Sequence, residues 1–184
     1  MKHSTHGSEP ETRRLFIALP LPQEARDALR DYQQTLHELG LRGSDTRPEN
    51  LHITLSFLGE QADAAPIIEA MDAMQTAGPV SLRLDRPGRF RQPEGALLWL
   101  GAGQDKAVRR LAAALDAALR QRGFSPEERQ FVTHITLCRR VKNADSLPRL
   151  PGVSIPCRAD SIVLYQSHRP GGVLTYTPIY TRRL

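Results

Sequence analysis

The feature that most constrains the fold is an internal repeat with an offset of 82 residues. The residues His52-Ile53-Thr54-Leu55 superpose on His134-Ile135-Thr136-Leu137 without a gap. An apolar strand and a helix precede the motif at matching distances in both halves, at 15–19 and 23–39 and again at 97–100 and 104–121. Two copies of so long a unit do not make a solenoid. The repeat therefore predicts two related lobes with approximate twofold symmetry.

The hydrophobic pattern predicts a chain of mixed α and β elements. Apolar residues at helical spacing predict helices, whereas alternation and short apolar runs predict strands. We expect the stretch 86–95, with its prolines and glycines, to be a loop or a crossing between the lobes, and 43–50 to be a polar turn. The predicted helices cover 23–39, 63–76 and 104–121, and the predicted strands cover 15–19, 51–58, 80–84, 97–100, 131–137, 153–157, 160–166 and 173–181.

The position of the repeated motif on a strand gives it chemical meaning. Side chains alternate across a strand, so His52 and Thr54 project from one face and Ile53 from the other. The same holds for His134 and Thr136 in the second copy. A twofold axis between the lobes would bring both polar faces to one cleft. That cleft would hold two imidazoles and two hydroxyls in mirrored positions.

Two imidazoles and two hydroxyls suit the cleavage of a phosphodiester. Displacement at phosphorus needs a base for the attacking water and an acid for the leaving oxygen, on opposite sides of the phosphorus atom. Histidine titrates near pH 6.5, so one neutral and one protonated copy coexist near neutrality. Threonine hydroxyls can donate hydrogen bonds to the non-bridging oxygens, whose charge must be stabilised in the transition state.

Other interpretations of these residues stay open at this point. A single His-x-Thr on a strand is more often a satisfied structural pair than a catalyst, although two copies in a repeat reverse that expectation. A metal site is less favoured because no carboxylate or third histidine stands at a consistent offset. His37 is expected to be a solvated surface residue, and His168 lies in a turn-like stretch. A nucleotide-binding module without catalysis is a further alternative.

Composition narrows the class of protein and its ligand. The 184 residues have an ordinary globular balance, 40% hydrophobic and 24% charged, which argues against wholesale disorder. The formal charge of +5 comes mostly from arginine, since lysine occurs only at positions 2, 106 and 142. Arginine is the better bidentate partner for phosphate, although a GC-rich coding bias would also favour it. The N-terminus has no apolar segment typical of a signal peptide, and two cysteines indicate reduced thiols, so we expect a cytoplasmic protein without a membrane span.

The motifs resemble the two-histidine (2H) phosphoesterase superfamily. The stretches 14–18 (RLFIA), 48–59 (PENLHITLSFLG), 164–167 (LYQS) and 176–178 (YTP) are similar to the RNA 2′,3′-cyclic phosphodiesterases, also called 2′-5′ RNA ligases or LigT-like proteins. The resemblance covers roughly residues 13–184. It implies an α+β fold with two lobes of antiparallel sheet and flanking helices around a central cleft. We therefore expect residues 1–12 to be a disordered tail and 13–184 to be a single bilobal domain.

The resemblance also implies an activity and its partners. It implies hydrolysis of a terminal 2′,3′-cyclic phosphate on RNA to a 2′-phosphomonoester, and a reverse 2′-5′ ligation that needs no ATP. Neither a cofactor nor a metal is implied. The partners would be RNA 3′ ends or nucleotides bearing a 2′,3′-cyclic phosphate, with no membrane and no obligate protein partner, and the protein would be a monomer. A phosphodiesterase of another small nucleotide, such as a 2′-5′ oligoadenylate, is the alternative within the superfamily.

The roles of individual residues follow from the same resemblance. It implies that His52 is the general acid, that His134 is the general base, and that Thr54 and Thr136 contact the phosphate. Arg139, five residues after His134, is expected to bind phosphate, with an exposed edge arginine as the alternative.

The equivalent position in the first copy is Phe57, which is expected to stack on a base or to pack between the lobes. Relatives often carry an arginine shortly before the first motif. In this chain Arg47 or Arg42 would have to take that place.

Overall fold

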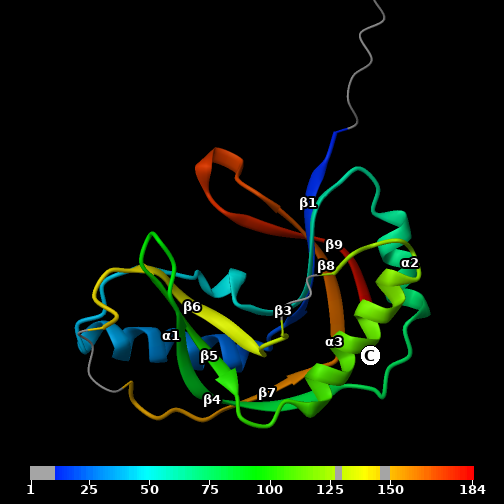
Figure 1. The fold of residues 1–184 in the computed structure, drawn as a ribbon. Coiled ribbons are helices and arrows are strands. Elements are labelled where there is room, and N and C mark those ends of the chain that lie inside the picture. Colours follow the sequence, from blue (N-terminus) through cyan, green and yellow to red (C-terminus); the bar gives the residue numbers. More distant parts are fainter. Residues whose placement is uncertain (1–10, 127–129, 146–149) are drawn as a thin grey trace, which may run out of the picture.

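The fold consists of two antiparallel sheets with three helices (Figure 1), as expected for an α+β protein with two lobes. The computed structural model describes residues 11–126, 130–145 and 150–184. The first ten residues of the expected tail lie outside these ranges. The first sheet has the strand order β3-β1-β8-β9 and the second has the order β2-β6-β5-β4-β7.

The bounds of the elements follow the predicted pattern closely. The first sheet contains β1 (Arg13–Pro20), β3 (His52–Gln61), β8 (Ser161–His168) and β9 (Thr175–Arg183). The second contains β2 (Ser44–Asp45), β4 (Val80–Phe90), β5 (Ala96–Ala102), β6 (His134–Val141) and β7 (Ile155–Ala159). The helices are α1 (Gln23–Glu38), α2 (Ala65–Ala73) and α3 (Lys106–Arg120), and short 3₁₀ turns span Pro48–Asn50 and Pro170–Gly172.

The expectation of a loop over 86–95 was wrong for its first half. β4 continues through Phe90 because its second part, from Leu84, pairs with β5. Its first part, Val80 to Leu84, pairs with β7 on the other side. From Arg86 onward β4 therefore has one neighbour only, and an edge position of this kind tolerates Pro87. The strand expected over 131–137 starts later than predicted, because β6 begins at His134.

Each half of the chain contributes a helix to the sheet of the other half. The apolar face of α1, which includes Leu29 and Leu36, packs against β6 and β7 in the second sheet. The apolar face of α3 packs against α2 and β3 of the first lobe, and also against β4 of the second sheet. Figure 1 shows α1 alongside the second sheet, between β6 and β7 in this view, and the α2–α3 pair beside β8 and β9. The two halves are thus interleaved along the chain.

The core runs through both lobes as one cluster of buried residues. β1 supplies Leu15, Ile17 and Leu19, and the motif strands supply Ile53 and Ile135 on their inner faces. These two isoleucines are 1% and 0% exposed, as the alternation of the motif predicted. Their burial fixes which face of β3 and β6 carries the histidines. Within the described ranges, no helix is both long and apolar enough to cross a bilayer.

Candidate active site

The two motif strands border one cleft of about 880 Å³. β3 belongs to the first sheet and β6 to the second, and the two strands contact each other across the lobes. The six residues expected to form the site line this cleft: His52, Thr54, Phe57, His134, Thr136 and Arg139. The structure thus brings together the two histidines and two threonines that the repeat placed at one cleft.

The two imidazoles are held in the same way. The Nδ1 atom of His52 lies 2.7 Å from the carbonyl oxygen of Asn50, and that of His134 lies 2.8 Å from the carbonyl oxygen of Val132. A carbonyl only accepts, so each Nδ1 carries a proton and donates it to the backbone two residues upstream. In the neutral ring, Nε2 is then the atom that accepts a proton. At His52 this atom accepts a hydrogen bond of 3.0 Å from the Thr54 hydroxyl.

Aromatic rings support both imidazoles. Phe16 lies beneath His52 with the ring centroids 5.0 Å apart, and Tyr176 meets the same imidazole edge-on at 5.2 Å. Phe90 meets His134 edge-on at 5.2 Å, and Trp99 approaches it at 6.1 Å. Such contacts restrict the ring orientation that the backbone hydrogen bonds already select.

Burial and neighbouring charges make both imidazoles weak bases. Burial lowers the pKa of His52 to about 4, against the opposing effect of the Asn50 hydrogen bond. Burial also lowers the pKa of His134, which the Val132 carbonyl opposes. The Arg139 guanidinium lowers both pKa values further, and a charge on His134 lowers that of His52. Two protons on this pair are therefore disfavoured, whereas one proton leaves an acid and a base side by side.

Arg139 and Phe57 occupy equivalent positions on their strands and both face the cleft. The Phe57 ring is 54% exposed and touches Phe16 at a centroid distance of 5.9 Å. In the described part of the chain, no ion pair joins Arg139 to a carboxylate. Both side chains are thus accessible to a ligand in the cleft.

The β8–β9 hairpin forms another wall of the cleft, which the sequence analysis did not predict. Arg169, Val173 and Tyr176 line the cleft from this hairpin. Arg47 and Asn50, which precede the first motif, both donate to the carbonyl oxygen of Leu174, the latter at 3.1 Å. Of the two arginines considered for this region, Arg47 lines the cleft and Arg42 does not. The only available signal was the Tyr-Thr-Pro stretch near the C-terminus.

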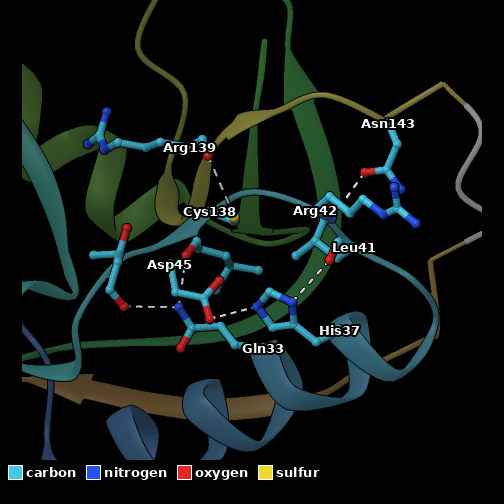
Figure 2. A network of polar contacts seen from close by, with 10 residues as sticks. Gln33, His37, Leu41, Arg42, Asp45, Cys138, Arg139 and Asn143 are labelled. Carbon is cyan, nitrogen blue, oxygen red and sulfur yellow. Dashed lines mark hydrogen bonds and ion pairs between the residues drawn. The ribbon is translucent and has the colours of Figure 1, made fainter. Parts of the chain in front are cut away.

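A polar network fixes the segment that leads from α1 to the first motif (Figure 2). His37 does not behave as a purely solvated residue, because its Nε2 lies 2.8 Å from the Asp45 carboxylate and its Nδ1 3.1 Å from the Leu41 carbonyl. Gln33 donates to the carbonyl oxygens of Thr46 and Leu137, at 3.0 and 2.8 Å. These contacts hold β2 as an edge strand on β6, so that Ser44 to Arg47 reach the cleft.

The described ranges contain no group of three or more His, Cys, Asp or Glu residues arranged to hold a metal ion. The two cysteines, Cys138 and Cys157, are buried and unpaired. Burial raises the pKa of the Cys138 thiol to about 12 and that of Cys157 to about 11. Neither thiol is therefore a nucleophile near neutral pH.

Comparison with known proteins gives a consistent result. Residues 21–171 match the model of the 2′-5′ RNA ligase superfamily. The chain is 31% identical to the RNA 2′,3′-cyclic phosphodiesterase of Escherichia coli K12, over 94% of this chain and 96% of that protein. It is also 31% identical to the enzyme of that name from Geobacillus stearothermophilus, over 83% of this chain, but it spans only 52% of the length of that relative.

Solved structures agree with the sequence comparison. The crystal structure of E. coli LigT complexed with 3′-AMP superposes with a TM-score of 0.79 at 30% identity, covering 95% of this chain and 99% of that one. The match thus extends over nearly the whole of both chains.

Proposed function

Because this chain belongs to the 2′-5′ RNA ligase superfamily, a family of two-histidine phosphoesterases, we propose that it hydrolyses the 2′,3′-cyclic phosphate at the 3′ end of RNA to a 2′-phosphomonoester. The observation that carries the proposal is the paired imidazoles in one cleft, each with its Nδ1 bound to a backbone carbonyl. The names of the E. coli and G. stearothermophilus relatives support the choice of substrate.

The chemistry proceeds in one displacement at phosphorus. The Nε2 atom of His134 takes a proton from a water molecule while the water oxygen bonds to phosphorus. The bond from phosphorus to the ribose O3′ breaks, and O3′ takes a proton from Nε2 of His52. The products are a free 3′-hydroxyl and a 2′-phosphomonoester. Each proton transfer contributes about 10²–10⁴-fold to the rate.

The hydroxyls and Arg139 stabilise the charge on the phosphate. Thr54 and Thr136 donate to the non-bridging oxygens, and the Arg139 guanidinium supplies a charge-assisted hydrogen bond. In this structure the Thr54 hydroxyl donates to His52 instead. When the phosphate binds, its negative charge favours the protonated form of His52 and releases this hydroxyl for the phosphate oxygens.

Two finer features belong to the proposal. Hydrolysis needs no metal ion, because the two imidazoles supply both proton transfers. In ligation a 5′-hydroxyl takes the place of the attacking water: His134 takes its proton, the bond from phosphorus to O3′ breaks, O3′ takes a proton from His52, and a 2′-5′ linkage forms without ATP.

Product analysis in ¹⁸O-labelled water tests the reaction. An oligoribonucleotide ending in a 2′,3′-cyclic phosphate is incubated with the protein in the presence of EDTA. We expect a 2′-phosphomonoester that carries one ¹⁸O atom. A 3′-phosphomonoester, or no turnover until a divalent metal is added, would contradict this account of the reaction.

The assignment of acid and base is tested with an activated leaving group. In a p-nitrophenyl phosphodiester of a nucleoside, the leaving group departs without a proton. His52→Ala should then recover much of the turnover that it loses on the cyclic phosphate, because only the acid is missing. His134→Ala should not recover. If only His134→Ala recovered turnover on this substrate, His134 would be the acid and His52 the base.

A further inference from the structure

The two motif strands carry the same irregularities at equivalent places. On β3, Leu55 is an extra residue, because Ile17 and Ala18 of β1 pair with Ser56 and Thr54. On β6, Leu137 is extra in the same way, since Leu98 and Trp99 pair with Cys138 and Thr136. The offset between Leu55 and Leu137 is again 82 residues. Bulges of this kind re-aim the side chains that follow them.

A second bulge follows on each strand, and here the halves differ. On β3 it ends at Gly59, whose φ is +70°. On β6 it lies between Cys138 and Val141 and places Arg140 at a φ of +54°. Arg140 is the one residue other than glycine with a positive φ in the described ranges. A left-handed backbone is disfavoured for a residue with a Cβ atom. Strain of this kind is common at functional sites, so the position of the Arg140 side chain is the next question.

The bulge brings two consecutive arginines to one cleft. In a regular strand Arg139 and Arg140 would point to opposite faces, yet both line the cleft. Gly95 packs against the bulge so closely that a Cβ atom there would lie 2.9 Å from the carbonyl carbon of Arg140. The close approach of the β4–β5 connection therefore supports this conformation.

The two arginines have different surroundings. Arg139 acts on the charge of both imidazoles. Arg140 instead donates to the Ser44 hydroxyl at 3.2 Å, at the β2 edge of the cleft. No ion pair of the described residues involves Arg140, and the nearby Asp45 carboxylate is bound to His37. Figure 2 shows this Asp45–His37 pair on the α1 side of β2, with the Arg139 side chain extending away from it. Among the described residues Arg140 thus has no acidic partner, and its side chain contacts the β2 edge of the cleft rather than the imidazole pair.

We propose that Arg140 binds a second phosphate of the substrate, the phosphodiester that joins the terminal nucleotide to the rest of the RNA. The inference rests on the proposed function, because that substrate has one anion at the reacting end and another one nucleotide away. A nucleoside 2′,3′-cyclic phosphate has only the reacting phosphate. Arg140 therefore selects RNA ends over free nucleotides, whereas Arg139 binds the reacting phosphate of either substrate.

Arg140→Asn tests the proposal, since asparagine tolerates a left-handed backbone and lacks the charge. The probes are a short oligoribonucleotide ending in a 3′-phosphate and a nucleoside 3′-monophosphate, titrated at several salt concentrations. We expect the variant to bind the oligoribonucleotide about five- to tenfold more weakly, and the slope of log K against log salt to fall by about 0.7, the value for one contact to a single strand. The nucleoside monophosphate should be affected much less. An unchanged slope, or equal weakening for both probes, would overturn the proposal.

Two further variants separate binding from a structural role. Arg110→Gln removes an exposed arginine on α3 and should change neither slope. Ser44→Ala removes the hydrogen bond but keeps the charge of Arg140, so its slope should match that of the wild type. If Ser44→Ala reproduced the effect of Arg140→Asn, the effect would come from the strand edge and the proposal would be wrong. Binding is measured without turnover, so a failure of hydrolysis would reject the proposed function but leave this result in place.

Discussion

At the scale of single residues, the chemistry depends on two imidazoles that are made alike by the backbone. In both, a carbonyl two residues upstream fixes the tautomer, and an aromatic ring restricts the orientation. Burial lowers the pKa of both imidazoles, that of His52 to about 4. The sequence predicted both histidines and their pairing. It did not predict the carbonyl contacts, because these depend on the path of the chain before each strand.

Replacing Arg139 should move the pH dependence of kcat/KM upward. The proposed mechanism needs one neutral and one protonated imidazole in the free enzyme, and both pKa values are lowered. We therefore expect the wild-type optimum of kcat/KM to lie below pH 6.5, because the acid is lost as the pH rises. Arg139 lowers both pKa values, so Arg139→Gln should shift both limbs of the profile to higher pH.

The same variant should lose about 10- to 100-fold in kcat/KM at its optimum, as expected for one charge-assisted hydrogen bond of about 1.5–3 kcal/mol. Rates measured from pH 4.5 to 9 on a cyclic-phosphate-ended oligoribonucleotide test both effects, with Arg110→Gln as the matched control. A profile that keeps its position or moves to lower pH would show that Arg139 does not act on the imidazoles.

At the scale of elements, alternation predicted the strands but not their bulges. The apolar runs and the His-x-Thr pattern locate β1, β3, β5 and β6, although β6 runs from His134 to Val141 rather than over 131–137. The bulges depend on which strands become neighbours, and the pairing is not encoded in the local pattern. The extension of β4 to Phe90 escaped prediction for the same reason, because its pairing with β5 outweighs the local preference of Pro87 and Gly88 for a turn.

Gly95→Ala should destabilise the protein through the second bulge. Gly95 has a φ of +119°, and a Cβ atom there would meet backbone atoms of Arg140 and Val141 at 2.9–3.2 Å. We expect the free energy of unfolding to fall by about 2 kcal/mol or more, since the left-handed region alone costs about 1–2 kcal/mol and the clash adds to it. Gly152→Ala is the matched control, because a Cβ atom there meets nothing within 4 Å.

Urea unfolding of the two variants, followed by circular dichroism, measures the difference. Gly152→Ala should stay within about 0.5 kcal/mol of the wild type. Equal stability of Gly95→Ala and Gly152→Ala would show that a methyl group at position 95 fits against the backbone of Arg140 and Val141.

At the scale of the whole molecule, the lobes are related by sequence but not independent in structure. α1 covers the second sheet, α3 packs against β3 of the first sheet and β4 of the second, and β8 and β9 from the second half complete the first sheet. The repeat predicted two lobes, yet the exchange of helices between them could not be predicted, because amphipathic helices fit either sheet. We propose that residues 13–184 fold as one unit, since separation of the halves would expose both sheets.

Unfolding should accordingly occur in a single transition. Trp99 is the one tryptophan of the chain and lies in the second sheet, so its fluorescence reports on that lobe. Far-ultraviolet circular dichroism reports on both lobes. We expect the two signals to give the same midpoint in urea. Separate midpoints would show that the lobes unfold independently.

The most direct test of the account is the turnover of a cyclic-phosphate-ended oligoribonucleotide by His52→Ala, His134→Ala and the double variant. Each single variant should lose about 10²–10⁴-fold in kcat, while its circular dichroism spectrum stays that of the wild type. The double variant should be little worse than the poorer single variant, because the two imidazoles act in one step. Wild-type turnover by either folded single variant would contradict the claim that these two histidines act together on one phosphorus atom.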